Sequence, residues 1–150
     1  MCSSNELHFD KMPFYAAVVN SEDANSDGLH WLALAFFVRD ERVECNYFDS
    51  LGGGMLTMVP NIKNFIWRHA DVLYLNSNRI QSLSSSVCGL YSTYFIICMQ
   101  NKIKFQDFLL QFSSDVDFND QSVFKLFYSA LKNLAKVNNE SKVLACRALI

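Results

Sequence analysis

A cysteine lies where a polar loop meets a long apolar stretch, and this position suits nucleophilic chemistry. The loop is rich in serine and ends in Cys88-Gly89, and an apolar run follows from Leu90 to Met99. This pattern predicts a loop that turns into a buried helix, with Cys88 at the helix N-terminus. There the free backbone N–H groups and the helix dipole stabilise a thiolate, the nucleophilic form of cysteine. The alternative is an inert, buried cysteine at the start of a helix.

A cysteine hydrolase also needs a base, a group that orients the base, and donors for the oxyanion. His30 opens one predicted strand and Asp49 closes the next, so antiparallel pairing brings them to the same end of the sheet. Gln81, seven residues before Cys88, is the candidate side-chain donor, together with the backbone N–H of Cys88. We therefore predict His30, Asp49, Gln81 and Cys88 as catalytic residues, with no metal and no cofactor. The histidines from which the base must come are His8, His30 and His69.

Each of these residues has an ordinary interpretation when it is taken alone. A histidine at a strand start is commonly a surface or core residue, and an aspartate before a glycine-rich turn commonly bonds its own backbone. A glutamine in a polar loop is usually solvated. The prediction of a catalytic site therefore depends on the co-occurrence of all four residues.

The predicted elements form an α+β fold in which the helix that carries Cys88 packs on a mixed or antiparallel sheet. The run at residues 29–38 is apolar on both faces, which is typical of a central strand. A charged turn at residues 39–42 and an irregular lead-in at residues 1–12 are also predicted, and the loop at residues 113–120 offers Asp117 and Asn119 as N-caps. The last predicted helix has apolar positions from Val123 to Leu134 and ends at Asn138-Asn139, before a short helical or loose tail. The other predicted strands are residues 14–20, 43–49 and 71–76, and the other predicted helices are residues 60–69, 88–101 and 105–112.

Composition restricts the function classes that need considering. The 150 residues fit a single domain, residues 1–150, and the 51% hydrophobic content is enough for a core. The formal net charge of −2 provides no global basic field for nucleic acid, and no apolar run is long enough for a membrane span. Five cysteines without a Cys-x-x-Cys pair argue against a disulfide framework or a zinc site. We see no signal peptide, so we expect reduced thiols and a protein that is not secreted.

Several motifs together resemble the adenain family, the maturation proteases of adenoviruses, within the broader Ulp1-like clan that includes the SUMO proteases. The motifs are His30-Trp31, the Phe48-Asp49-Ser50-Leu51-Gly52 segment, and Gln81 followed by Cys88-Gly89-Leu90. Their type, order and approximate spacing match over roughly residues 14–100. The interval from Gln81 to Cys88 is similar to that of adenain, whereas SUMO proteases usually have one residue fewer.

The resemblance implies a papain-like core and a cysteine endopeptidase that cuts viral precursor proteins after small residues such as glycine. It places the protein in the host cell nucleus or the virion. Adenain is activated by a viral peptide through a disulfide and by DNA. Here the position equivalent to that cysteine is Ala70. The sequence has 13 Lys and Arg and 15 Asp and Glu, and this balance argues against DNA as a cofactor. The 29 residues before His30 are fewer than in adenain, so from the resemblance we expect part of the cleft or of a regulatory surface to be absent or replaced.

Two other functions remain as alternatives. One is a ubiquitin-like-modifier (SUMO-type) isopeptidase of the same clan, which would need a surface for a folded modifier and a channel for its Gly-Gly tail. The other is a binding module without catalytic activity that kept the fold. That module would be expected to have lost at least one catalytic position, and the sequence shows no such loss.

Overall fold

A computed structural model describes residues 1–9, 12–22 and 30–147, with side chains up to residue 135. Within these residues, five strands form one mixed sheet in the order β1-β2-β3-β4-β5. The two outer pairs, β1 with β2 and β4 with β5, are parallel, and the two inner pairs are antiparallel. The strands are β1 (Cys2–Ser3), β2 (Phe14–Asn20), β3 (Trp31–Arg39), β4 (Arg42–Phe48) and β5 (Val72–Leu75).

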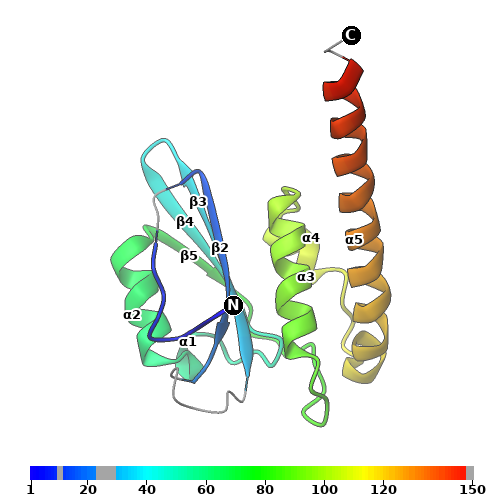
Figure 1. The fold of residues 1–150 in the computed structure, drawn as a ribbon. Coiled ribbons are helices and arrows are strands. Elements are labelled where there is room, and N and C mark those ends of the chain that lie inside the picture. The colour runs from blue at the N-terminus through cyan, green and yellow to red at the C-terminus, as the bar shows by residue number, and fades with distance from the viewer. Residues whose placement is uncertain (10–11, 23–29, 148–150) are drawn as a thin grey trace.

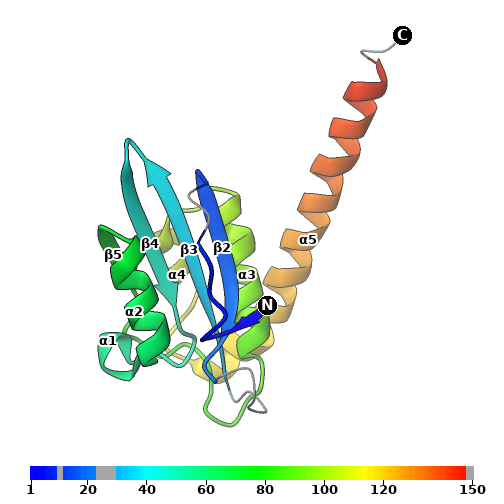
Figure 2. The ribbon, with the colours of Figure 1, turned by 60° about the vertical axis from the view of Figure 1, so that its left-hand side comes forward.

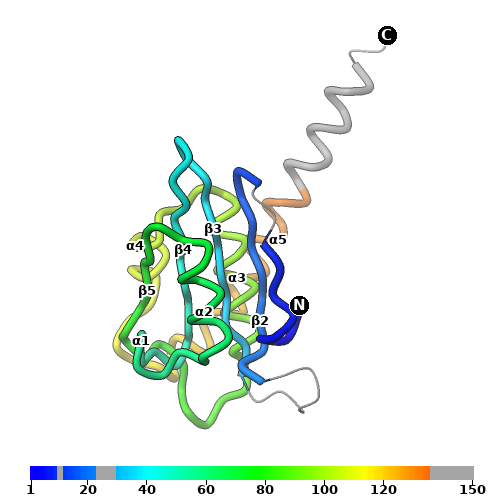
Figure 3. The backbone as a smooth tube through the Cα atoms, turned by 90° about the vertical axis from the view of Figure 1, so that its left-hand side faces the viewer, coloured from blue at the N-terminus to red at the C-terminus, as the bar shows by residue number. Residues whose placement is uncertain are grey.

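Helices cover both faces of this sheet. The short helix α1 (Gly54–Thr57) and α2 (Pro60–His69) lie on one side, and α3 (Cys88–Gln100), α4 (Phe105–Leu109) and α5 (Val116–Arg147) lie on the other (Figure 1; Figure 2). Viewed from the α2 side, the helix crosses in front of the central strands (Figure 3). The result is a three-layer arrangement of helices and sheet. Its α+β class agrees with the prediction.

Both faces of the central strand β3 are apolar because each face packs against a helical layer. Residues 32–36 of this strand are fully buried or nearly so. Ala33 and Ala35 pack into the core beneath α3, whereas Leu32, Leu34 and Phe36 pack into the core beneath α2. Successive side chains of a strand point to opposite faces, so a strand between two helical layers must be apolar throughout. The small alanines leave room for α3 to pack close to the sheet.

The charged turn between β3 and β4 determines how the two strands pair. Asp40 and Glu41 have φ values of 47° and 67°, the left-handed conformation of a two-residue hairpin. The register that follows pairs Arg39 with Arg42 and Ala33 with Phe48. His30 and Asp49 therefore lie just beyond the far end of the hairpin, as predicted.

Several predicted boundaries were wrong in detail. The lead-in contributes the two-residue strand β1, helix α1 was missed, and α4 ends at Leu109 rather than at residue 112. The last helix begins at Val116, so Asp117 and Asn119 lie inside it, and Asp115 caps it by accepting the N–H of Phe118 at 3.0 Å. The same helix continues through Asn138-Asn139 to Arg147. Leu29 of the predicted central strand and residues 148–150 of the predicted tail lie outside the described residues.

No helix in the described part of the chain is both long and apolar enough to cross a membrane. Among the residues with described side chains, the free cysteines are Cys2, Cys45, Cys88 and Cys98.

Gly52 provides a test of the turn that follows Asp49. Its φ is +74°, and a Cβ there would lie 2.7 Å from the backbone oxygen of Ser77 and 2.8 Å from the backbone nitrogen of Arg79. We expect Gly52→Ala to lower the free energy of unfolding by about 1–3 kcal/mol, because strain and a backbone clash act together.

Chemical denaturation measures this effect. Gly89→Ala is the matched control, because a Cβ at Gly89 meets its nearest atom, in the Trp31 ring, at an ordinary 3.6 Å. Equal stability of the two variants would contradict the assignment of strain to Gly52.

Candidate active site

Cys88 is the first residue of helix α3, as the polar-to-apolar transition predicted. The helix packs against β3 and is buried along most of its length. This packing fixes the position of its N-terminus relative to the sheet. Burial opposes ionisation of the Cys88 thiol. A hydrogen bond and the charge of His30, together with backbone hydrogen bonds at Trp31 and Gly89, outweigh burial and lower the pKa of Cys88. The site therefore favours a thiolate.

His30 and Asp49 meet at the end of the β3–β4 hairpin. The Nε2 atom of His30 lies 2.7 Å from Oδ1 of Asp49, and both side chains are mostly buried. His30 also forms a side-chain hydrogen bond with Cys88. Because Asp49 contacts Nε2, the other ring nitrogen, Nδ1, remains for the cysteine. The structure thus brings Cys88, His30 and Asp49 into one chain of hydrogen bonds.

The electrostatics of His30 match this arrangement. Burial lowers the pKa of the imidazole, but hydrogen bonds to Asp49 and Cys88, and the negative charges of both, raise the pKa of His30 to about 9. The same contact that favours the thiolate favours the imidazolium, because the two groups titrate as a pair. The contact therefore favours the charged form of the pair, thiolate with imidazolium.

Asp49 combines two roles that the sequence presented as alternatives. Its Oδ1 accepts the backbone N–H of Leu51 at 2.8 Å, so it is a turn aspartate that bonds its own backbone, and the same atom contacts His30. The backbone of Asp49 is held by the buried side chain of Asn76, which accepts the N–H of Asp49 at 3.0 Å and donates to its carbonyl at 2.6 Å. These bonds join the end of β4 to the segment after β5 and fix the carboxylate.

Gln81 is not a solvated loop residue. It is 2% exposed, its Oε1 accepts the hydroxyl of Ser50 at 2.6 Å, and its Nε2 donates to the carbonyl of Ser85 at 2.9 Å. The backbone N–H groups of Ile80 and Gln81 both donate to the carbonyl of Ser50 at 3.0 Å. Ser50 directly follows Asp49, so one short segment contacts both His30 and Gln81.

The loop around Gln81 is also held by the first turns of α5. Asn119 is buried and donates to the carbonyl of Ile80 at 3.0 Å. Asp120 accepts the backbone N–H of Ser82 at 3.2 Å and the hydroxyl of Tyr91 at 3.0 Å. The residues on either side of Gln81 are therefore fixed to α5, a contact that no sequence pattern predicted.

Trp31 lies beside the N-terminus of α3. Its carbonyl accepts the hydroxyl of Ser92 at 3.0 Å, and its ring is the nearest group to the site where a Cβ on Gly89 would lie. The other two histidines lie elsewhere: His69 ends α2, where its ring packs on Phe65, and His8 lies in the exposed N-terminal segment.

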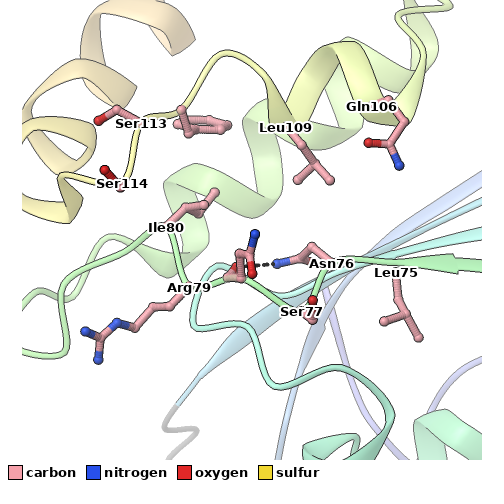
Figure 4. Close-up of a pocket in the computed structure, with 11 residues that line it drawn as sticks. Leu75, Asn76, Ser77, Arg79, Ile80, Gln106, Leu109, Ser113 and Ser114 are labelled. Atoms are coloured by element: carbon pink, nitrogen blue, oxygen red, sulfur yellow. Dashed lines mark hydrogen bonds between the residues drawn. The ribbon is translucent and has the colours of Figure 1, made fainter.

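A pocket of about 690 Å³ lies behind the Gln81 loop, between the segment after β5 and helix α4. Figure 4 shows Asn76, Ser77 and Ile80 on one side and Leu109 and Gln106 on the other. Neither Cys88 nor His30 lines this pocket. The described residues contain no cluster of metal-binding side chains.

Comparison with solved structures identifies the fold. A crystal structure of the ASFV pS273R protease, in its selenomethionine form, matches with a TM-score of 0.50 and 22% identity over 77% of this chain and 43% of the protease chain. This chain shares its fold with that protease, a mixed α+β fold with a five-stranded mixed sheet and helices. A second crystal structure of the ASFV protease matches with a TM-score of 0.48 and 23% identity, over 77% of this chain and 42% of that one. AvrA, in a structure with IP6 and CoA, matches with a TM-score of 0.42 and 19% identity, over 83% of this chain and 53% of AvrA.

The similarity to the first of these structures shows a shared fold and does not extend to activity. This chain spans less than half the length of the ASFV protease and about half that of AvrA. No family model matches the sequence, and no curated protein matches it significantly.

Asp49→Asn tests the electrostatic link between the two strands. The amide has no negative charge, so we expect the pKa of His30 to fall from about 9 toward its ordinary range. An NMR titration of the His30 ring, assigned with a His30→Ala variant, measures this change.

Asp71→Asn is the matched control, because the Asp71 carboxylate accepts the N–H of Val43 near the opposite end of β4. A His30 pKa that is the same in wild type and in Asp49→Asn would show that Asp49 does not stabilise the imidazolium.

Proposed function

We propose that this chain is a cysteine endopeptidase in which Cys88 is the nucleophile, His30 the acid and base, and Asp49 the group that orients His30. The observation that carries this proposal is the chain of hydrogen bonds from Asp49 through His30 to Cys88 at a helix N-terminus. A cysteine with a lowered pKa beside a histidine with a raised pKa is the arrangement that peptide hydrolysis by a cysteine nucleophile requires.

The mechanism follows from these positions. The Cys88 thiolate attacks the carbonyl carbon of the peptide bond, and the carbonyl oxygen becomes an oxyanion. An N–H of Gln81 and the backbone N–H of Cys88 donate to that oxyanion. The His30 imidazolium gives its proton to the leaving amine, which leaves a thioester on Cys88. Neutral His30 then takes a proton from water, the hydroxide attacks the thioester, and the acid product and the thiolate are released.

The substrate class is inferred from the resemblance to adenain, which implies cleavage of viral precursor proteins after small residues such as glycine. Trp31 supports this choice, because its ring lies against Gly89 and narrows the space beside Cys88. A larger side chain next to the cleaved bond would contact the indole ring. The site would work in the nucleus or the virion, as that resemblance implies.

Activation would differ from that of adenain. Ala70, at the position equivalent to adenain's activating cysteine, is the C-cap of helix α2 and has no thiol to form a disulfide. An activating peptide or protein would therefore bind without a covalent bond at that position. The net charge of −2 argues against stimulation by DNA.

Hydrolysis of a fluorogenic peptide, acetyl-Gly-Gly-aminomethylcoumarin, tests the proposed activity. We expect wild-type protein to release the fluorophore, and Cys88→Ala to reduce the rate by more than about 1,000-fold, because no nucleophile remains. A probe with leucine in place of the glycine next to the cleaved bond should react more slowly.

Cys98→Ala is the matched control, because Cys98 is a buried free cysteine on the same helix whose pKa is raised by burial. Equal loss in both variants, or no loss in Cys88→Ala, would contradict the assignment. Cleavage of a SUMO fusion protein without cleavage of the short peptide would favour the isopeptidase alternative.

A further inference from the structure

The Gln81 amide must face the oxyanion with its NH₂ end if it is to act as a donor. A glutamine amide has an oxygen end and an NH₂ end of nearly the same shape, and its surroundings decide which end faces which way. Only the NH₂ end can stabilise an oxyanion, since the oxygen end would repel it. The orientation of the Gln81 amide is therefore a requirement of catalysis.

We propose that the Ser50 hydroxyl is the positioning group that holds the Gln81 amide with its NH₂ end toward the oxyanion. The inference rests on the proposed function, because it assigns that role to Gln81. The hydroxyl of Ser50 lies 2.6 Å from Oε1 of Gln81, and these residues are 0% and 2% exposed. Both residues are buried, so removing the hydroxyl would leave the oxygen end of the amide without its donor.

The hydrogen bond at the NH₂ end of the Gln81 amide agrees with this orientation. Nε2 of Gln81 donates to the carbonyl of Ser85 at 2.9 Å, and a carbonyl can only accept. A reversed amide would place two carbonyl oxygens against each other there. One of the two N–H groups serves Ser85, and the second is the group that the mechanism assigns to the oxyanion.

The side chain and the backbone of Ser50 have separable tasks. The carbonyl of Ser50 accepts the backbone N–H groups of Ile80 and Gln81, which fixes where the loop lies. The hydroxyl fixes only how the Gln81 amide is rotated. Ser50→Ala keeps the two backbone bonds and removes the hydroxyl alone, so it isolates the positioning role.

The first experiment is independent of catalysis. In protein labelled with ¹⁵N-glutamine, the side-chain NH₂ signals of Gln81 are assigned with a Gln81→Ala variant, and their exchange with solvent is measured. We expect slow exchange in wild type and at least about tenfold faster exchange in Ser50→Ala at equal global stability, because the buried amide loses its partner. Ser85→Ala keeps the Ser85 carbonyl and is the matched control. Equal exchange of the Gln81 amide in wild type and Ser50→Ala would overturn the proposal.

The second experiment is a double-mutant cycle on hydrolysis of the Gly-Gly coumarin probe. We expect Ser50→Ala to lower kcat about tenfold with little change in KM, a smaller loss than the 10²–10³-fold typical of removing an oxyanion donor. In a Gln81→Ala background, Ser50→Ala should have no further effect, because it acts through Gln81. Losses that multiply in the double variant would show a general structural role and overturn the proposal.

The two readouts also separate this proposal from the proposed function. If the wild-type chain does not cleave the probe, the amide exchange still reports on Ser50 and Gln81. If Ser50→Ala does not fold, Ser50→Cys keeps the size and a weak S–H donor, and we expect intermediate amide exchange and intermediate kcat. If Ser50→Cys shows the wild-type amide exchange and the wild-type kcat, with and without Gln81→Ala, the hydroxyl is not the positioning group.

Discussion

The contact between His30 and Asp49 at the open end of one β-hairpin is the constraint on which the site depends. The two residues are 19 positions apart, and a tight turn at Asp40 and Glu41 fixes the register that brings them within 2.7 Å. Once His30 is held by Asp49, its ring has one nitrogen left for the cysteine. Helix α3 carries that cysteine at its first residue. The helix packs closely on the small alanines of β3, and this packing positions the cysteine.

The second half of the site is built on the same short segment. Asp49 directly follows β4 and provides a carboxylate for His30. Ser50 follows with a carbonyl for the Gln81 loop and a hydroxyl for the Gln81 amide. Asn76 holds the backbone of Asp49 from the neighbouring strand end. The base and the proposed oxyanion donor are thus positioned by adjacent residues, so small shifts of this segment affect both.

The sequence predicted the parts of this arrangement that follow from periodicity. The apolar run of β3 and the charged hairpin turn are local patterns that predicted His30 and Asp49 at the same end of the sheet, and the polar-to-apolar change predicted Cys88 at a helix start. Cys88 was joined to the other two by the co-occurrence of residues that a cysteine hydrolase needs and by the resemblance to adenain. The contacts of Asn119 and Asp120 with the Gln81 loop were missed, since Asn119 and Ile80 are 39 positions apart and their side-chain-to-backbone bond has no periodicity. Asn119 instead resembled an N-cap, a task that Asp115 performs. Asn76 was predicted only as the end of a strand, and Ser50 only as part of a motif. Their contacts were missed, because burial distinguishes these two residues and composition does not.

The most direct test of the central claim is the pH dependence of alkylation of Cys88 by iodoacetamide. We predict that Cys88 reacts below the pH at which a free thiol ionises, about 8.5, because its pKa is lowered by His30 and by backbone hydrogen bonds in spite of burial. In His30→Ala, burial then acts with less opposition, so the reactive limb should move to higher pH. An alkylation profile that matches a free thiol and does not change in His30→Ala would contradict the thiolate–imidazolium pair.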